Sequence, residues 1–230
     1  MNIAIIVAAG RGYRLGGPLP KQYLPLAGQP ILRHTIQALA AHPRIGAVQV
    51  LIHPDDTALY TAATAGLSIL PPLLGGAARQ DSVRLGLEGV AALNPANVLI
   101  HDAVRPFITH ATISAVLDAL QHSPCALAGV PLADTLKRVE NGRVTATVDR
   151  ANLYRAQTPQ GFGFAAILKA HRQVQGLGIE FTDDCMIAEH LGMPVEMVLG
   201  SEDNFKITTA QDLQRAEIFL KTKLQEGASP

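Results

Sequence analysis

Residues 3–10, IAIIVAAG, are the stretch of the chain from which the fold is best predicted. The run from Ile3 to Ala9 is continuously apolar, which is typical of a strand buried on both faces of a parallel sheet, and Gly10 ends it. A second run of this kind, Ile45 to Ile52, follows a predicted helix over residues 30–42. Strand, helix and strand in this order predict the βαβ unit of an α/β protein.

The same alternation continues through the first 130 residues. Further strands are predicted over 97–101 and 125–130, and helices over 56–65, 82–93 and 112–121. Downstream, the pattern predicts helices near 165–174, from 182 or 183 and from 209 or 210, and a strand at 195–199. The expected fold class is therefore α/β, with a Rossmann-like, mostly parallel sheet flanked by helices.

A β-hairpin arm interrupts this pattern at about residues 132–150. Asn141 and Gly142 lie between two β-type runs, 135–139 and 143–148, and Asn-Gly in this position is the strongest short-range hairpin signal. An isolated two-stranded hairpin is marginal in water, so the arm is expected to protrude and pack on something. Its own domain and a second subunit are equally good candidates on this evidence.

The composition excludes several classes of protein. The chain has 230 residues, 48% of them hydrophobic, which is enough for a buried core. Nineteen Lys and Arg residues balance nineteen Asp and Glu residues, so no nucleic-acid partner is expected. No membrane or export segment is visible, and Cys125 and Cys185 are interpreted as packing residues, so the expected location is the cytoplasm. No acid precedes Asp55, whereas five Arg and Lys residues do, which suits an anionic ligand.

Ligands of open parallel sheets bind beyond the carboxyl ends of the strands, and glycines and cations follow the first predicted strand. Gly10 and Gly12 allow backbone amides to approach a phosphate, and Arg14 and Lys21 supply positive charge. The glycine spacing misses the dinucleotide-binding fingerprint by one residue, and Lys21 is not followed by Ser or Thr as in a P-loop. A nicotinamide enzyme and a P-loop enzyme are both disfavoured, while a plain surface loop stays open.

Two later segments have the same placement. Gly75 and Gly76 lead into a helix that Asp81 or Ser82 could cap, and capping alone would explain both polar residues. The segment from His101 to Arg105 places an acid and a base directly after a buried strand. A structural Asp-Arg pair would explain it, but a ligand contact is favoured, and His101 is interpreted as a near-core residue.

In their order along the chain, these motifs resemble the 2-C-methyl-D-erythritol 4-phosphate cytidylyltransferase family. The matching segments are Ala8-Ala9-Gly10-x-Gly12-x-Arg14, Pro20-Lys21-Gln22, Gly75-Gly76-x-x-Arg79-x-x-Ser82-Val83, His101-Asp102-Ala103-x-Arg105-Pro106, Asp134-Thr135-x-Lys137, Thr147-Val148-Asp149-Arg150, Gln157-Thr158-Pro159-Gln160, Thr182-Asp183-Asp184 and Asn204-x-Lys206-x-Thr208. Ala78 departs from the Glu that the family often has, and Val104 from its usual Ala. Ribitol 5-phosphate cytidylyltransferases share much of this set.

The resemblance implies a cytidylyltransferase that uses CTP and a polyol phosphate, with Mg²⁺ or another divalent cation, in non-mevalonate isoprenoid biosynthesis. It implies catalytic roles for Arg14, Lys21, Arg150 and Lys206; CTP contacts at Ala8, Ala9, Gly10, Gly12, Gly76, Ser82 and Asp102; and polyol-phosphate contacts at Arg105, Thr135, Thr158 and Thr182. It also places Asp102 near the metal.

The resemblance further implies a homodimer in which Thr135 and Arg150 reach the neighbouring subunit's site from the arm. Residues 1–230 are then expected to be a single nucleotidyltransferase domain. Two alternatives remain: a ribitol 5-phosphate cytidylyltransferase and a non-catalytic nucleotide-binding regulator. Val104 favours the ribitol enzyme, whereas the Ala8-Ala9-Gly10 loop favours the methylerythritol enzyme.

Overall fold

The computed structural model describes residues 1–11, 19–225 and 227 of the chain. The expectations for Gly12 and Arg14 concern residues outside these ranges.

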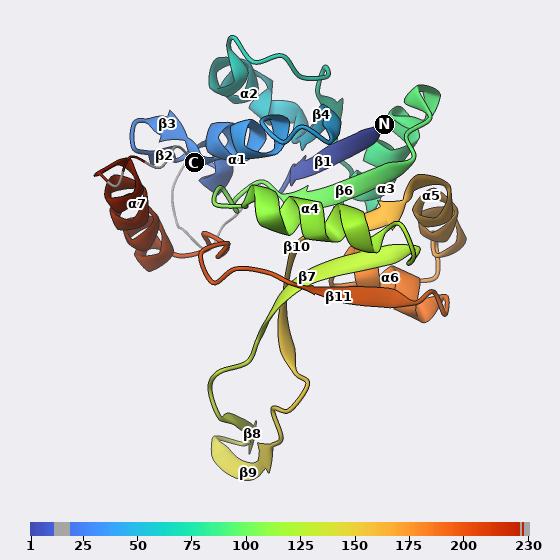
Figure 1. Cartoon of the computed structure of the whole chain (residues 1–230), viewed down its shortest axis with the longest axis vertical. Helices are drawn as coiled ribbons and strands as arrows, with labels where there is room; N and C mark the ends of the chain where they lie inside the picture. Colours follow the sequence, from blue (N-terminus) through green and yellow to red (C-terminus); the bar gives the residue numbers. More distant parts are fainter. Residues whose placement is uncertain (12–18, 226, 228–230) are drawn as a thin grey trace.

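Seven strands form one sheet in the order β11-β7-β10-β6-β1-β4-β5. Strand β1 (Asn2–Ala8) pairs in parallel with β4 (Ile45–Ile52) and with β6 (Asn97–Asp102). The other parallel pairs join β4 to β5 (Leu73–Leu74) and β7 (Cys125–Pro131) to β11 (Val195–Leu199). The mostly parallel α/β sheet predicted from the sequence is confirmed, with β1 near its centre (Figure 1).

Strand β10 (Tyr154–Gly163) was not predicted from the sequence. It lies between β6 and β7 and runs antiparallel to both. Its middle residues Gln157, Thr158 and Gln160 are polar yet buried, so the segment lacks the apolar pattern of a buried strand. Hydrogen bonds satisfy these side chains; Gln157, for example, donates to the Ser201 carbonyl over 2.8 Å.

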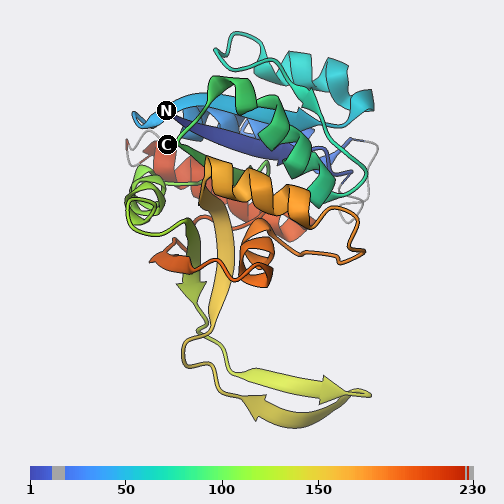
Figure 2. The ribbon, with the colours of Figure 1, turned by 90° about the vertical axis from the view of Figure 1, so that its right-hand side faces the viewer.

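Helices cover both faces of the sheet, as Figures 1 and 2 show. One face packs on α1 (Ile31–Ala40), α2 (Thr57–Thr64) and α4 (His110–Ala119), the other on α3 (Arg79–Gly89), α5 (Phe164–Gln173) and α6 (Asp184–His190). Helix α7 (Ala210–Gln225) packs on a third cluster with β2 (Pro25–Leu26), next to β3 (Gln29–Pro30). Short 3-10 helices lie at η2 (Lys21–Tyr23), η3 (Pro54–Asp56) and η4 (Ala91–Leu93).

Helix α3 begins three residues earlier than the sequence suggested. We expected it to start at Ser82, whereas its first residue is Arg79. The Asp81 carboxylate accepts a hydrogen bond of 3.3 Å from the backbone N–H of Ala78, which satisfies one of the free donors at the helix start. As a result, Arg79 belongs to the first turn of α3 rather than to the preceding loop.

The arm consists of β8 (Leu136–Glu140) and β9 (Arg143–Val148), which form a sheet of their own. Asn141 and Gly142 have φ values of 50° and 77°, as expected of an Asn-Gly turn. The hairpin projects far from the sheet (Figure 2), and Val139 and Val144 are 56% and 63% exposed. The predicted hairpin is confirmed, and these strands do not pack on the body of their own chain.

Two further features of the described residues bear on the cellular setting. Cys125 and Cys185 are buried and make no disulfide, so their interpretation as packing residues is confirmed. Burial raises the pKa of the Cys125 thiol to about 11, which keeps it protonated and unreactive. No helix in the described part of the chain has both the length and the apolar character needed to cross a bilayer.

Candidate functional site

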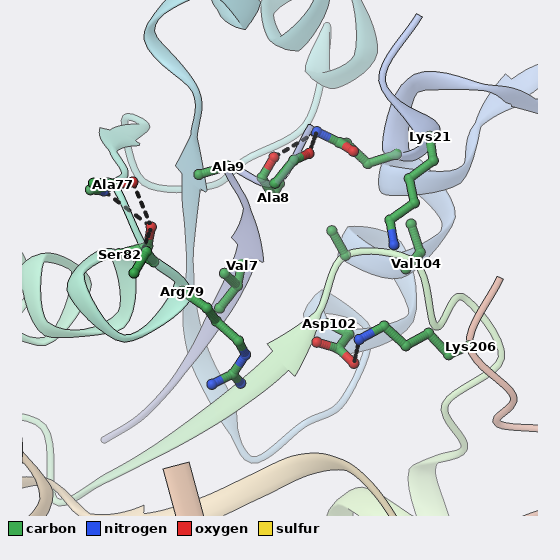
Figure 3. A pocket seen from close by; sticks show the side chains of 15 residues that line it. Val7, Ala8, Ala9, Lys21, Ala77, Arg79, Ser82, Asp102, Val104 and Lys206 are labelled. Atoms are coloured by element: carbon green, nitrogen blue, oxygen red, sulfur yellow. Dashed lines mark hydrogen bonds and ion pairs between the residues drawn. The ribbon is translucent and has the colours of Figure 1, made fainter. Parts of the chain in front are cut away.

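A cavity of about 200 Å³ opens at the carboxyl ends of β1 and β6 (Figure 3). Its walls come from five parts of the chain: the end of β1, the turn at η2, the start of α3, the loop after β6 and the segment between β11 and α7. The lining residues that concern function are Ala8, Ala9, Gly10, Lys21, Gln22, Gly76, Ala78, Arg79, Ser82, Asp102, Val104 and Lys206. This is the position at which an open parallel sheet binds its ligand.

Gln22 connects the turn that carries Lys21 to the end of β1. Its side chain is buried, and its amide nitrogen donates to the backbone carbonyls of Ala8 over 2.7 Å and Gly10 over 3.2 Å. Lys21 precedes it in the same short helix and extends along the cavity in Figure 3. One buried amide therefore fixes the turn that carries Lys21 relative to the loop after β1.

The wall opposite Lys21 is built from small residues because the chain segments approach closely there. A Cβ atom on Gly75 would lie 2.4 Å from that of Ala9, closer than real side chains come. The Ser82 hydroxyl accepts a hydrogen bond of 3.1 Å from the Gly76 N–H and donates to the Ala78 carbonyl over 3.0 Å. The result is a narrow slot lined by backbone groups, which suits a flat, polar ring such as a nucleobase.

Two cations pair with Asp102 at the floor of the cavity. Its Oδ2 atom lies 2.9 Å from Lys206 Nζ and 3.3 Å from Arg105 Nε. Burial raises the pKa of this carboxyl group, but the nearby Lys206 and Arg105 more than offset burial and hold the pKa well below its usual range. Asp102 is therefore ionised at neutral pH and orients both cations.

The buried His101 and Thr158 fix the backbone that presents Asp102. The Asp102 N–H donates to Thr158 Oγ1 over 3.1 Å, and this hydroxyl lies 2.9 Å from His101 Nδ1. His101 Nε2 faces the Arg105 carbonyl at 3.1 Å, so Nε2 carries the proton and Nδ1 accepts from Thr158. Burial lowers the pKa of His101 to about 4, which keeps the ring neutral. The interpretation of His101 as a near-core residue is confirmed by its complete burial.

A second cavity, of about 220 Å³, adjoins the first. Arg79, Asp102 and Lys206 line both cavities. The second cavity is completed by Arg105, Ala156, Gln157, Thr158, Gln160, Thr182 and Asp183. Two polar cavities that share a charged wall can hold two substrates with their reacting groups facing each other.

Most site residues predicted by the resemblance are brought together here. Lys21, Lys206, Ala8, Ala9, Gly10, Gly76, Ser82 and Asp102 line the first cavity, and Arg105, Thr158 and Thr182 line the second. Thr135 and Arg150 are exposed on and beside the arm and line neither cavity. Arg14 and Gly12 lie outside the described residues.

Sequence reasoning gave no role to three residues that the structure places in or behind the site. Arg79 lines both cavities, Gln22 holds the loop after β1, and Asn204 accepts from Arg105 Nη1 through its carbonyl over 2.7 Å. All three occur in the motifs quoted above, and that was the only available signal.

The donor set for a metal is small. The described residues contain no cluster of three or more His, Cys, Asp or Glu side chains. Asp102 is the one carboxylate among the described residues that line the first cavity. Mg²⁺ commonly takes one or two protein carboxylates and completes its coordination with water and substrate phosphates, so a single carboxylate in this cavity is compatible with Mg²⁺.

Comparison with known proteins identifies close relatives. The family model for 2-C-methyl-D-erythritol 4-phosphate cytidylyltransferase matches residues 2–222. The chain is 59% identical over 215 residues to the bifunctional enzyme IspD/IspF of Paramagnetospirillum magneticum, and 54% identical over 215 residues to that of Rhodospirillum rubrum. These alignments cover 94% and 93% of this chain but 56% of each relative, so the chain spans just over half their length.

A solved structure shows the same architecture. The crystal structure of 2-C-methyl-D-erythritol 4-phosphate cytidylyltransferase from Thermus thermophilus is 34% identical, with a TM-score of 0.79 over 94% of this chain and 98% of that chain. The protein from Francisella tularensis is 29% identical, with a TM-score of 0.80 over 94% of this chain and 98% of that one.

Proposed function

The chain belongs to the 2-C-methyl-D-erythritol 4-phosphate cytidylyltransferase family, and on that basis we propose that it transfers the cytidylyl group of CTP to 2-C-methyl-D-erythritol 4-phosphate in non-mevalonate isoprenoid biosynthesis. The products are 4-diphosphocytidyl-2-C-methyl-D-erythritol and pyrophosphate. The observation that carries the proposal is the pair of adjoining cavities with a shared charged wall. CTP occupies the first cavity and the polyol phosphate the second.

In the proposed reaction, an oxygen of the acceptor phosphate attacks the α-phosphorus of CTP in line. A new P–O bond forms, the bond to the β-phosphate oxygen breaks, and the electron pair leaves with pyrophosphate. The protein supplies position and charge rather than a nucleophile. The hydroxyls of Ser82 and Thr158 are held in hydrogen bonds to neighbouring groups, which agrees with a reaction that uses no protein nucleophile.

Lys21 and Lys206 are the described cations that neutralise charge on the α-phosphate and on the leaving pyrophosphate. Lys206 is held by Asp102 at 2.9 Å and lines both cavities, so it lies where the transferred group passes. Arg14 joins them in the prediction from sequence. Arg105 and Thr182, which line the second cavity, are assigned to the acceptor phosphate. The Thr158 hydroxyl, predicted with them, donates its proton to His101 Nδ1 and so supports the cavity wall beside them.

Asp102 is the residue that we propose to hold a divalent cation, Mg²⁺, together with the phosphates of CTP. When bound, the ion neutralises the triphosphate and polarises the bond to the leaving group. The two ion pairs of Asp102 are both made through Oδ2, and they keep the carboxylate ionised and oriented toward the cavity floor.

The base is proposed to be read by backbone groups around Gly76 and Ser82 and at Ala8 and Ala9. A slot that hydrogen-bonds one base edge rejects a base with reversed donors and acceptors by about 10⁴-fold, because its own groups are left unpaired. UTP is therefore expected to be a poor substrate.

Val104, which favoured ribitol 5-phosphate as the acceptor, lines the first cavity and not the second. Val104 therefore does not line the cavity assigned to the acceptor, and the methylerythritol assignment is preferred.

We also propose that the protein acts as a homodimer with composite sites. The arm leaves the valines of both strands exposed, and Thr135 and Arg150 do not reach the cavities of their own chain. A mixture of Lys21→Ala and Arg150→Ala subunits tests this arrangement. Each variant alone is expected to be inactive, but a mixed dimer has one intact site, so an equal mixture recovers about a quarter of the activity. No recovery after verified subunit exchange contradicts composite sites.

The activity test uses the chain with CTP, MgCl₂ and the methylerythritol phosphate. Phosphorus NMR should show the triphosphate signals replaced by pyrophosphate and a new diphosphate diester, with no reaction when the acceptor is omitted. Lys21→Met should lose about 10²- to 10³-fold in turnover, while Lys169→Met, on the exposed face of α5, should match the wild type.

An acceptor panel decides among the alternatives. Turnover with ribitol 5-phosphate alone contradicts the assigned acceptor. CTP binding without turnover on any acceptor indicates a regulator instead of an enzyme. The reaction is proposed to take place in the cytoplasm, in keeping with two buried, unpaired cysteines.

A further inference from the structure

Asp184, at the start of α6, has a completely buried side chain with a separate partner for each oxygen. Its Oδ2 lies 2.7 Å from Arg79 Nη2, and its Oδ1 lies 3.2 Å from His171 Nε2. His171 comes from α5 and is also completely buried. Asp184 therefore connects the buried His171 to Arg79, which lines the site.

The backbone of Asp184 is held as firmly as its side chain. The Gln160 side-chain oxygen on β10 accepts from the N–H groups of Asp184 and Cys185 over 3.0 and 3.2 Å. The Gln160 amide donates to Asp183 over 2.9 Å, and Asp183 caps α6 by accepting from Met186 N over 2.8 Å. The two adjacent acids thus have different tasks: Asp183 begins the helix, and Asp184 points into the core.

Burying a carboxylate is unfavourable unless it is paired, and Arg79 and His171 supply that pairing for Asp184. Burial raises its pKa, but Arg79 and His171 outweigh burial and lower the pKa below the usual range. The group that Asp184 holds is the guanidinium of Arg79, whose side chain is 29% exposed. The Arg79 side chain lines both cavities.

Arg79 is one of the three residues that line both cavities. The other two, Asp102 and Lys206, pair with each other at 2.9 Å, whereas Arg79 pairs with the buried Asp184, which lines neither cavity. Figure 3 shows its side chain extending from the start of α3 toward Asp102. A guanidinium has five N–H donors in a fixed fork, and the Asp184 pair uses Nη2, so donor capacity remains for an anion.

We propose that Arg79 contacts the phosphoryl group that passes between the two cavities, and that Asp184 and His171 are positioning residues that hold its guanidinium there. This inference rests on the proposed cytidylyl transfer and adds a cation to it. A contact made with the transferred group strengthens as charge builds in the transition state, so its loss lowers kcat more than it raises KM for either substrate.

The test compares Arg79→Ala with Arg84→Ala, five residues further along α3. Arg84 pairs with Glu88 and lines neither cavity. Arg79→Ala is expected to lower kcat about 100-fold with KM changed only a few-fold, and Arg84→Ala to match the wild type. Guanidinium chloride at low, non-denaturing concentration should restore part of the kcat of Arg79→Ala, whereas urea at the same concentration should not.

The positioning role has its own readout. Asp184→Asn is expected to lower kcat about tenfold, and His171→Gln to act in the same direction. The Arg79→Ala, Asp184→Asn double variant should be no slower than Arg79→Ala, because Asp184 acts through Arg79. If Asp184→Asn does not fold, Asp184→Glu, which keeps the charge but shifts it, takes its place in the cycle.

Three outcomes overturn the inference. If Arg79→Ala has the same kcat as Arg84→Ala, Arg79 makes no contact with the transferred group. If the losses of kcat in Arg79→Ala and Asp184→Asn add up in the double variant, Asp184 does not act through Arg79. In both cases the wild type still turns over and the proposed function stands. A wild-type chain that releases no pyrophosphate from CTP and acceptor overturns the proposed function and this inference with it.

Discussion

Gln22→Met is expected to lower both stability and turnover, whereas Gln49→Met is expected to lower stability alone. The two glutamines are closely matched: both are buried, and both donate from the amide nitrogen to two backbone carbonyls. Gln22 binds Ala8 O and Gly10 O at 2.7 and 3.2 Å; Gln49 on β4 binds Pro71 O and Val50 O at 2.8 and 3.3 Å. Only the first pair of bonds touches the candidate site.

The magnitude follows from the bonds that are lost. Methionine fills a similar volume but donates nothing, so the buried Ala8 carbonyl loses its side-chain partner, which costs about 1–3 kcal/mol. For a chain of this size, that corresponds to a fall of roughly 3–10 °C in the thermal midpoint. The thermal midpoint of Gln49→Met should fall by a similar amount. The shorter hydrogen bond of Gln49, to the Pro71 carbonyl, matches the Gln22–Ala8 hydrogen bond in length to within 0.1 Å.

The turnover should separate the two variants. Without its amide link, the turn carrying Lys21 is free to shift against the loop after β1, and a misplacement of about 1 Å can cost 10²-fold in rate. Pyrophosphate release measured well below each variant's midpoint gives the comparison. Equal turnover in Gln22→Met and Gln49→Met, with equal loss of stability, refutes the idea that the Gln22 amide positions Lys21.

Three further predictions concern the same cleft. Gly10→Ala should melt like the wild type but raise the KM for CTP, because Gly10 lines the first cavity and a Cβ there would meet no atom of the described residues within 4 Å apart from its chain neighbours. Gly75→Ala should lower the melting temperature as well, since its Cβ would lie 2.4 Å from that of Ala9. Acidification should destabilise the protein through His101, whose pKa is about 4 in the folded chain and near 6.5 in the unfolded chain. The neutral ring therefore contributes fully to the free energy of unfolding above pH 6.5. This contribution, about 3 kcal/mol, is lost as the pH falls toward 4. Urea titrations at pH 7 and 4.5 should show a smaller drop for His101→Gln, and an equal drop contradicts the assignment.

The sequence predicted the strands that are apolar and buried, because burial on both faces leaves no other pattern. Strands β1 and β4 were bounded to within a residue. The arm was predicted from its Asn-Gly turn, which is a local signal. Strand β10 was invisible because its polar side chains are satisfied by partners far away in the chain, such as the hydrogen bond between Gln157 and Ser201.

The excess of Arg and Lys in the first 54 residues is a weak indication of an anionic ligand, because most of these side chains have partners within the protein. Arg11 pairs with Asp55 and Asp56, Arg44 pairs with Asp118, and Arg33 donates to backbone carbonyls at the end of α2. Acids from later segments therefore neutralise much of the excess, and a window of sequence does not show this. Of the cations counted there, Lys21 is the described one that lines the first cavity.

The residues that touch the cavities were found mainly through the resemblance, and the residues behind them were not. Asp184 and His171 act through contacts between α6, α5 and α3, and no spacing within one segment encodes such contacts. In the sequence, Arg79 is distinguished only by its place in a motif, because a helix that starts at Ser82 leaves Arg79 in a loop. The earlier start of α3 is what turns it into part of the wall.

The arm and the second cavity have a common origin in the one antiparallel strand of the sheet. Because β10 runs antiparallel to β7, the chain between them can continue as a hairpin, and the arm is that continuation beyond the sheet edge. The register of the pair shifts between Ala156 and Gln160, and bulges of this kind redirect side chains. Gln157 and Thr158 fall in the shifted segment and line the second cavity. A parallel strand in this place would have needed a crossover helix and would have supplied neither the arm nor this wall.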